Sequence, residues 1–189
     1  MGTDKKSMEL GGKTFLERVV ESARGICDEV MVSVASEAQR REVEGMALGG
    51  AATVVDEEGP IGPLGGLLTA LRRCTCEYAL VLTCDSPAPR SGVLRRMLAE
   101  IGDHDALVPR DGDCVHPLQA LYRTGPLRSA CEETLGGGAR DVKGAVARMA
   151  DVRYISVEEF RAQDRELLTF FNVNTPGDLE RLKALLGAG

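Results

Sequence analysis

The stretch at residues 78–87, YALVLTCDSP, is the clearest sign of how this chain folds. Residues 79–83 are all apolar or β-branched, and turn-forming residues follow them directly. A short apolar run that ends in a turn is typical of a strand buried on both faces, as in a parallel sheet. Because Pro87 has no backbone N–H and disfavours helical geometry at Ser86, we expect the strand to end near Asp85. The Asp85 carboxylate would then lie at the carboxyl edge of the sheet, where open α/β sheets bind ligands, unless it only caps a turn.

Helix and strand patterns alternate on both sides of this stretch. The predicted helices, from apolar residues at helical spacing, cover residues 16–23, 37–46, 62–71 and 94–101. The predicted strands, from β-branched and apolar runs, cover residues 29–35, 52–56 and 78–83. This alternation is typical of a doubly wound sheet with helices packed against it.

The second half of the chain is less regular. Two short strands are expected at residues 106–109 and 118–122, with a turn at Asp111-Gly112 that allows a hairpin. The remaining predicted elements are helices from residue 126 and over 142–149, and strands over 152–155 and 170–173. The last helix is expected to begin in TPGD, residues 175–178, which offers a capping threonine, a first-position proline and an acidic residue.

Length and charge limit the classes of protein to consider. The chain of 189 residues is long enough to bury a substantial core, and we expect one domain over residues 1–189. The formal net charge of −6 argues against an extended surface for nucleic acid or for a membrane, while leaving room for a local anion site. The six cysteines lack the paired spacing of zinc sites, so we expect them to be reduced and the protein to be cytoplasmic.

Four features point to one edge of the predicted sheet. Lys5 lies in a polar, glycine-containing loop, and Asp56 and Asp85 each end a strand. Between the two carboxylates, residues 59–66 (GPIGPLGG) supply backbone N–H groups at a helix start, where negative charge is favoured. A cation, two carboxylates and open backbone donors suit a nucleotide with its Mg²⁺ ion. Each feature also has an ordinary explanation, such as a solvated lysine or a tight entry into a helix.

Several motifs together resemble one family. The segments MGTDKKSMELGGKTFLERV, GPLGG, VLTCDSP, HPLQALYR and FFNVNTPGDL are similar to motifs of the molybdenum cofactor guanylyltransferases, in the same order over almost the whole chain. The resemblance implies an α/β, Rossmann-like three-layer nucleotidyltransferase fold with a mostly parallel sheet and helices on both faces. It also implies transfer of GMP from GTP to molybdopterin, with Mg²⁺ as cofactor and pyrophosphate as the leaving group, and molybdoenzyme maturation proteins as partners.

The resemblance assigns residues to the nucleotide side of the site. Lys5 would contact the GTP phosphates, and Asp85 would hold Mg²⁺ together with phosphate, so these two are the expected catalytic residues. The full set expected at the nucleotide is Lys5, Asp56, Gly62, Pro63, Leu64 and Asp85. Of these, Gly62, Pro63 and Leu64 would contribute backbone beside guanine and ribose.

On the acceptor side, the resemblance assigns His116, Asn172 and Asn174. The two asparagines alternate along an expected strand, so both side chains would point the same way. Each assignment has a structural alternative: His116 as a loop residue before proline, and the asparagines as partners of local backbone. Arg140 and Lys143 would either meet an anionic pterin phosphate or form a solvated helix face.

The sequence departs from the family pattern in two places. Family members carry an apolar strand and an LAGGxSxR loop before the MGxDK motif, whereas this sequence starts inside that motif. We expect a natural chain that begins upstream, because a sheet without its middle strand leaves unpaired backbone groups. Residues 33–36 (SVAS) replace asparagines that often touch the nucleotide, so recognition there would be weaker or through backbone.

Two other functions remain open from sequence. One is a different nucleotidyltransferase that uses CTP or modifies another small phosphorylated acceptor. The other is a non-catalytic nucleotide- or pterin-binding module, if Met1 is the true start of the protein. Nucleotide screening separates the first from guanylyl transfer, and the DNA upstream of Met1 bears on the second.

Overall fold

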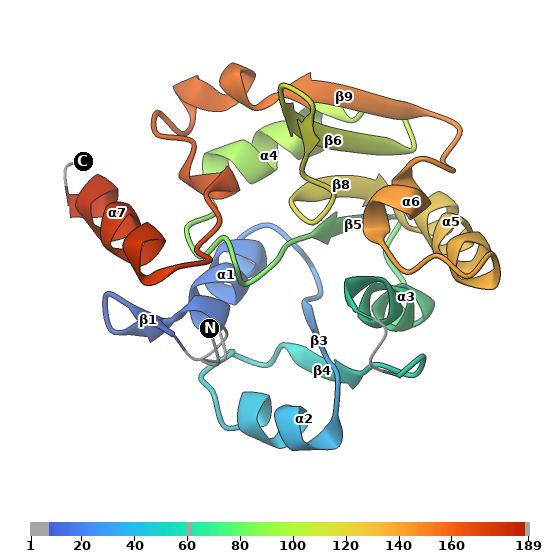
Figure 1. The fold of residues 1–189 in the computed structure, drawn as a ribbon, viewed down its shortest axis with the longest axis horizontal. Coiled ribbons are helices and arrows are strands. Elements are labelled where there is room, and N and C mark those ends of the chain that lie inside the picture. The colour runs from blue at the N-terminus through green and yellow to red at the C-terminus, as the bar shows by residue number, and fades with distance from the viewer. Residues whose placement is uncertain (1–7, 60–61, 188–189) are drawn as a thin grey trace.

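The computed structural model describes residues 8–59 and 62–187, so Lys5 lies outside the described residues. The strands are β1 (Glu9–Leu10), β2 (Lys13–Thr14), β3 (Met31–Val34), β4 (Ala52–Val55), β5 (Tyr78–Val81), β6 (Ala106–Asp111), β7 (Cys114–Val115), β8 (Ala120–Arg123) and β9 (Val152–Ser156). The helices are α1 (Phe15–Arg24), α2 (Glu37–Glu44), α3 (Pro63–Arg73), α4 (Ser91–Glu100), α5 (Thr124–Gly136), α6 (Val142–Val146) and α7 (Pro176–Gly187), with 3-10 helices η2 (Val157–Ala162) and η3 (Leu168–Phe170). Strands lie between two groups of helices (Figure 1).

The strands form two main sheets. In the smaller one, β3 and β4 pair in parallel. In the larger one, β8 lies between β5 and β6 and pairs antiparallel with both, so β5 and β6 run in the same direction. Strand β9 adds to β6 in parallel, and β7 forms a short hairpin with β6. Strands β5, β6 and β9 therefore run in one direction while β7 and β8 are reversed, so this sheet is mixed rather than mostly parallel.

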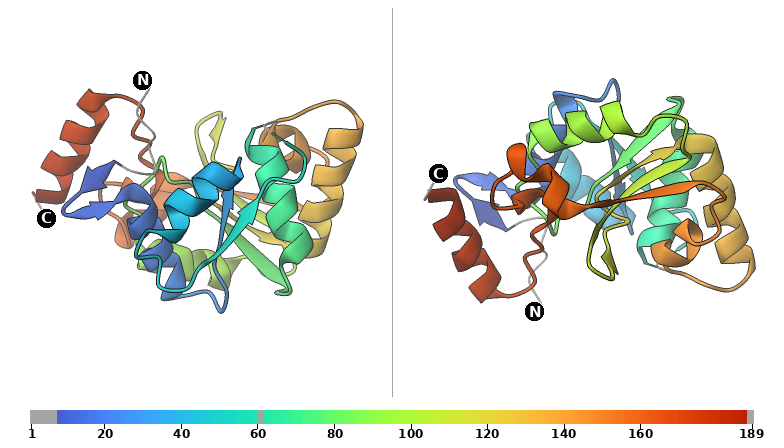
Figure 2. Two further views of the ribbon diagram at one scale, coloured as in Figure 1. Left: turned by 90° about the horizontal axis from the view of Figure 1, so that it is seen from below. Right: turned by 90° about the horizontal axis from the view of Figure 1, so that it is seen from above.

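Side-chain alternation along β6 creates a core on each face of the larger sheet. Ala106 and Val108 pack with residues of α3, α5 and α6, whereas Leu107 packs with residues of α4 and with Phe160 of η2. All three β6 residues are fully buried. The two views in Figure 2 show the same arrangement, with α3 and α5 on one side of the strands and α4 on the other. The three-layer α/β fold predicted from the sequence is confirmed.

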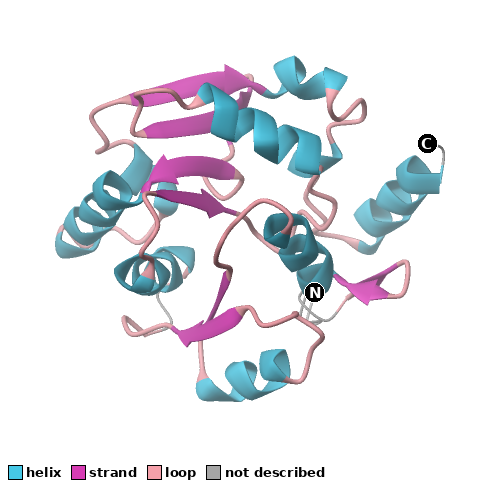
Figure 3. Cartoon of the chain, turned by 180° about the vertical axis from the view of Figure 1, so that it is seen from behind, coloured by secondary structure: helices cyan, strands magenta, loops and turns pink. Residues whose placement is uncertain are grey.

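Strand β5 differs from its prediction in burial and in length. Its residues are half-buried rather than buried on both faces, and it ends at Val81 instead of near Asp85. Within the described residues β5 pairs with β8 on one edge, and no strand pair joins it to β3 or β4 (Figure 3). The pairing with β8 stops at Val81 opposite Ala120, so nothing holds the following residues extended.

Two further predictions needed correction. The turn at Asp111-Gly112 is present, but it joins β6 to β7, and β8 pairs with a more distant part of β6. Residues 170–173, predicted as a strand, instead leave η3 as an irregular extended segment. This segment follows Leu167, which adopts the left-handed conformation with φ of 53°, a geometry that interrupts a strand.

Helix ends agree well with local sequence rules. The Thr175 hydroxyl accepts a hydrogen bond from the Asp178 N–H (3.1 Å), and the Asp178 carboxylate accepts one from the Thr175 N–H (2.8 Å). Thr14 and Glu17 form the same reciprocal cap at α1. The six cysteines are free thiols, as expected. None of the helices in the described part of the chain has the length and apolar character needed to cross a membrane.

Candidate active site

Asp85 lies in the turn that follows β5. It is half-buried, and its backbone N–H faces the Thr83 hydroxyl at 3.4 Å. Its backbone carbonyl accepts a hydrogen bond from the Val173 N–H (2.8 Å), which ties the turn to a segment almost ninety residues further along the chain. The Asp85 turn is therefore positioned by tertiary contacts, in addition to its place at the carboxyl end of a strand.

A buried hydrogen-bond network connects three of the sequence motifs. The Gln119 side-chain N–H donates to the Ser86 hydroxyl (2.6 Å), and that hydroxyl donates to the Asn172 side-chain oxygen (2.6 Å). Ser86 and Gln119 are only 2% and 4% exposed. Because an unpaired polar group in such a place is costly, the network holds the VLTCDSP, HPLQALYR and FFNVNTP segments in one arrangement. Gln119 was missed as a functional residue, although it lies inside a motif that carried the resemblance.

Asn172 and Asn174 lie on either side of a buried residue, and the Asn172 side chain takes part in the network. Asn172 directs its side-chain oxygen into the buried network, which leaves its amide N–H₂ group as the part able to meet a ligand. Both Asn172 and Asn174 are exposed while Val173 between them is 1% exposed. Exposed and buried residues thus alternate here as predicted, although the strand predicted to produce the alternation is absent.

The segment that carries the asparagines is anchored by a second buried cluster. The Asp164 carboxylate, 4% exposed, accepts hydrogen bonds from the Thr169 N–H (2.7 Å) and the Thr169 hydroxyl (2.8 Å). The Thr169 hydroxyl in turn accepts from the Arg90 N–H (3.0 Å), just before α4. These contacts fix the C-terminal segment against the loop that follows Asp85.

His116 lies beside this segment. Its ring centroid is 5.5 Å from that of Phe170, at an interplanar angle of 50°. Burial lowers the pKa of His116; the Asp111 carboxylate and a hydrogen bond with the Gln119 side chain oppose this shift, and the positive charge of Lys143 adds to it. The imidazole is therefore favoured in its neutral form. Lys143 on α6 lies near enough to disfavour the protonated form of His116.

The nucleotide-side residues lie after β4. The Asp56 N–H continues the parallel ladder by donating to the Val34 carbonyl (2.8 Å), and the Asp56 carboxylate accepts from the Glu58 N–H (2.9 Å). Gly62, with φ of 94°, precedes α3, and among the described residues no side chain caps this helix start. Leu64 is fully buried, and only its backbone can face a ligand.

The structure gives two of the SVAS residues local roles. A Cβ on Gly66 of α3 would collide with the Ser33 hydroxyl, so Ser33 marks a close approach of β3 to α3. Ser36 caps α2 by accepting a hydrogen bond from the Gln39 N–H (3.3 Å). Ser33 thus serves packing and Ser36 serves capping.

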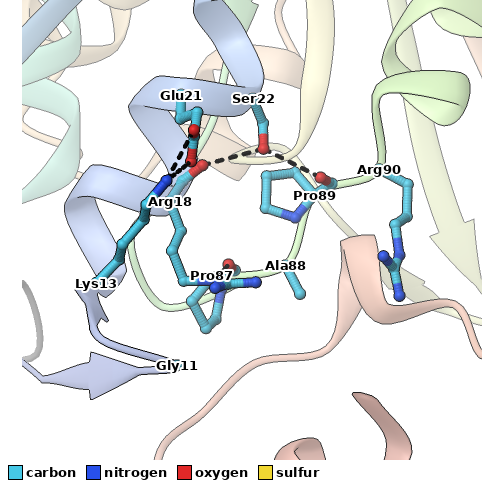
Figure 4. A pocket seen from close by; sticks show the side chains of 9 residues that line it. All are labelled: Gly11, Lys13, Arg18, Glu21, Ser22, Pro87, Ala88, Pro89 and Arg90. Carbon is cyan, nitrogen blue, oxygen red and sulfur yellow. Dashed lines mark hydrogen bonds and ion pairs between the residues drawn. The ribbon is translucent and has the colours of Figure 1, made fainter. Parts of the chain in front are cut away.

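A small polar cavity of about 170 Å³ lies between helix α1 and the loop at residues 87–90 (Figure 4). The Arg18 guanidinium donates to the backbone carbonyls of Pro87 (3.2 Å) and Leu10 (3.1 Å). The Ser22 hydroxyl lies 3.2 Å from the Pro89 carbonyl, to which it donates. Helix α1 thus supports the loop after Asp85, a role for Arg18 that nothing in the local sequence pattern indicated.

These features define an α/β nucleotidyltransferase: a sheet with an acidic turn at the carboxyl end of a strand, and an open helix start after a neighbouring strand. The sequence model described as "MobA-like NTP transferase domain" matches residues 1–152. A curated molybdenum cofactor guanylyltransferase from Desulfosudis oleivorans is 32% identical over 189 residues, covering 100% of this chain and 90% of the relative. The chain belongs to the molybdenum cofactor guanylyltransferase family.

Solved structures agree with this membership. Molybdopterin-guanine dinucleotide biosynthesis protein A from Archaeoglobus fulgidus superimposes with a TM-score of 0.83 at 28% identity, covering 100% of this chain and 93% of that chain. A Mycobacterium tuberculosis H37Rv protein in complex with manganese shares the fold, with a TM-score of 0.66 at 20% identity and coverage of 95% and 91%. A divalent metal is thus found in a protein of this fold.

Proposed function

We propose that this protein transfers the guanylyl group of GTP to molybdopterin, forming the guanine dinucleotide form of the molybdenum cofactor and releasing pyrophosphate. Family membership supports the reaction. The single structural observation that carries the proposal is the Ser86–Gln119–Asn172 network, because it holds the Asp85 turn beside the segments expected to bind the acceptor.

In this proposal Asp85 holds Mg²⁺ together with phosphate oxygens. A half-buried carboxylate at the end of a strand suits a hard cation, which takes one or two carboxylates and keeps several waters. When bound, the cation offsets the negative charge that grows on the departing pyrophosphate. Lys5 would contact the same phosphates; its role rests on the sequence motif.

The acceptor side needs orientation more than proton transfer. The terminal phosphate of molybdopterin is mostly ionised near neutral pH because its second pKa is about 6. One of its oxygens attacks the α-phosphorus of GTP, a new P–O bond forms, and the bond to the pyrophosphate group breaks. Neutral His116 and the amide of Asn172 would orient the pterin, and Lys143 would attract its phosphate. Asn174 completes the proposed acceptor set.

The nucleotide side would use Asp56 and the open start of α3. Gly62 and Pro63 are exposed there, and the first-turn N–H groups of α3 carry no side-chain cap. Such groups favour an anion or the polar edge of a base. We place the reaction in the cytoplasm, which the six free thiols support, and expect the product to pass to molybdoenzyme maturation proteins.

The test is transfer of label from α-labelled GTP, CTP, ATP or UTP to molybdopterin in the presence of Mg²⁺. We expect labelled pterin dinucleotide from GTP, with one pyrophosphate released per transfer. Preferential labelling by CTP would replace guanylyl by cytidylyl transfer. Binding of GTP or molybdopterin by calorimetry without any transfer would overturn the proposal and identify a binding module.

A further inference from the structure

A second group of metal-ligating side chains lies at the amino end of β5. Glu29 precedes β3, Cys74 ends helix α3, and Cys76 precedes β5. One ligand atom from each of the three residues lies within 4.8 Å of the other two. The Cys76 sulfur and the Glu29 Oε1 atom are 3.3 Å apart, with the thiol donating to the carboxylate.

These separations approach those of a tetrahedral zinc site. With Zn–S bonds of about 2.3 Å and Zn–O bonds of about 2.0 Å, tetrahedral angles put sulfur and oxygen roughly 3.5 Å apart and two sulfurs roughly 3.8 Å apart. The Cys76–Glu29 pair already has this spacing. A shift of about 1 Å by the Cys74 side chain is enough to complete a three-ligand set.

The backbone around the cluster is held by hydrogen bonds. The Thr75 N–H donates to the same Glu29 Oε1 atom (3.1 Å), which orients the carboxylate toward the two thiols. The hydroxyl of Thr124, a residue 6% exposed, donates to the Cys76 carbonyl (2.8 Å). Such contacts outside the ligand set are the ones that position ligands in metal sites.

The surroundings favour a cation and allow it to enter. Asp28 carries a negative charge close enough to Cys76 to interact with it. Glu29 is exposed, and both cysteines are partly accessible. A hollow of about 550 Å³, lined in part by Asp28, Glu29 and Arg73, opens beside the carboxylate.

We propose that Glu29, Cys74 and Cys76 bind one Zn²⁺ ion, with water in the fourth position. Thiolate donors favour Zn²⁺ over Mg²⁺, and each thiol releases its proton to solvent as its S–Zn bond forms. The ion would link the segment leading into β3 with the segment leading into β5. Because these strands belong to different sheets, the metal would cross-link the two sheets.

This site is independent of guanylyl transfer. It lies at the opposite end of β5 from Asp85, and a four-residue strand spans about 13 Å. Loss of the Zn²⁺ site and failure of the proposed reaction are therefore separate results.

The test is titration of the reduced full chain with Zn²⁺ alone. Calorimetry measures the binding, and thermal unfolding measures its effect on stability. We expect one equivalent to bind, unaffected by millimolar Mg²⁺, and the unfolding midpoint to rise with Zn²⁺. Co²⁺ in place of Zn²⁺ should show thiolate-to-metal absorption. The double change Cys74→Ser and Cys76→Ser should weaken binding by more than about a hundredfold, and Glu29→Gln by about tenfold.

The matched control is Cys114→Ser, which removes an exposed cysteine on β7 and should leave the Zn²⁺ affinity unchanged. Far-UV circular dichroism and cooperative thermal unfolding check that each variant is folded. Absence of a stoichiometric site in the parent chain would overturn the proposal. So would retention of binding in the folded double variant.

Discussion

The two ends of β5 carry different chemistry. At the carboxyl end, the Asp85 carboxylate is followed by the Ser86–Gln119–Asn172 network, in which Ser86 and Gln119 are buried. At the amino end, two thiols face a carboxylate, and the cluster is open to solvent. Hard donors at one end suit a phosphate-bound Mg²⁺ ion, and thiols at the other suit Zn²⁺.

The difference shows how neighbouring segments decide what a strand end can do. The carboxyl-end turn is held by segments from the second half of the chain, through the Val173 N–H and the Gln119 amide. The amino end is held by Glu29, which leads into the other sheet, and by Thr124. The proposed roles differ in the same way: one end would bind a substrate that is exchanged at each turnover, and the other would link two sheets through a metal ion.

The largest expected effect comes from removing the carboxylate at the carboxyl end. Asp85→Ala should lower GMP transfer at least about a hundredfold, because charge on the leaving pyrophosphate is no longer offset. The half-buried position means that the fold should survive. Asp103→Ala, which removes an exposed carboxylate after α4, is the matched control and should retain activity. Magnesium-dependent turnover near the parent rate in Asp85→Ala would remove Asp85 from the site.

The second prediction concerns the buried network behind Asp85. Gln119→Leu should lower the free energy of unfolding by about 1–3 kcal/mol, because Ser86 and Asn172 lose a buried donor. Denaturant unfolding measures this loss, and the KM for molybdopterin should rise as Asn172 loses its orientation. Gln163→Leu, at an exposed position, should change stability by less than about 0.5 kcal/mol. Equal stability of the two variants would mean that the network does not position the segments.

The third prediction moves to the amino end. Thr124→Val removes the hydroxyl that donates to the Cys76 carbonyl and should cost about 1 kcal/mol of unfolding free energy. It should also weaken Zn²⁺ binding about tenfold while leaving GMP transfer unchanged. Thr124→Ser keeps the hydroxyl and serves as the control. A change in transfer rate with unaltered Zn²⁺ affinity would contradict the separation of the two ends.

Local features of the fold were predictable from the sequence. The apolar stripe of α1 and the reciprocal Thr175–Asp178 cap depend on residues three or four apart, and both appear as expected. The alternation that buries Leu107 on one face and Val108 on the other follows from strand geometry. In each case the interacting groups are neighbours on one element.

Features that depend on distant parts of the chain were not predictable. The apolar run after Tyr78 suggested full burial, but burial of β5 depends on which strands flank it, and here β8 pairs with one edge. Gln119 meets Ser86 across 33 residues, and Glu29 meets Cys76 across 47. The cysteines lack the paired spacing of zinc sites, and the carboxylate of the proposed Glu29–Cys74–Cys76 site is distant in the sequence, so no local pattern predicted that site.

The candidate site was predicted in part. The position of Asp85 in the turn after a strand, and the exposure of Asn172 and Asn174 around buried Val173, follow from motif and alternation. The support from Arg18 and Gln119 arises only when three segments pack together. Motifs thus indicated the candidate ligand-binding residues, and the contacts that hold those motifs in place required the structure.

The smallest expected effect is a pH dependence at the carboxyl end. Burial lowers the pKa of His116 below its ordinary value of 6.5, with Asp111 opposing the shift and Lys143 adding to it. Between the two pKa values the unfolded chain binds a proton that the folded chain does not, so stability rises with pH there. The contribution is present above about pH 6.5 and is lost as pH falls toward the folded-state pKa. His116→Gln should therefore flatten the acid side of the stability profile measured by denaturant unfolding.

Titration of the His116 ring by NMR tests the cause directly, with His104→Gln used to assign the two histidine signals. We expect a lowered pKa in the free protein. Addition of molybdopterin should raise it, because an acceptor phosphate beside the imidazole stabilises the protonated form. Addition of Zn²⁺ should leave it unchanged, because that ion binds at the other end of β5. A pKa that responds to Zn²⁺ but not to molybdopterin would reverse the assignment of the two ends.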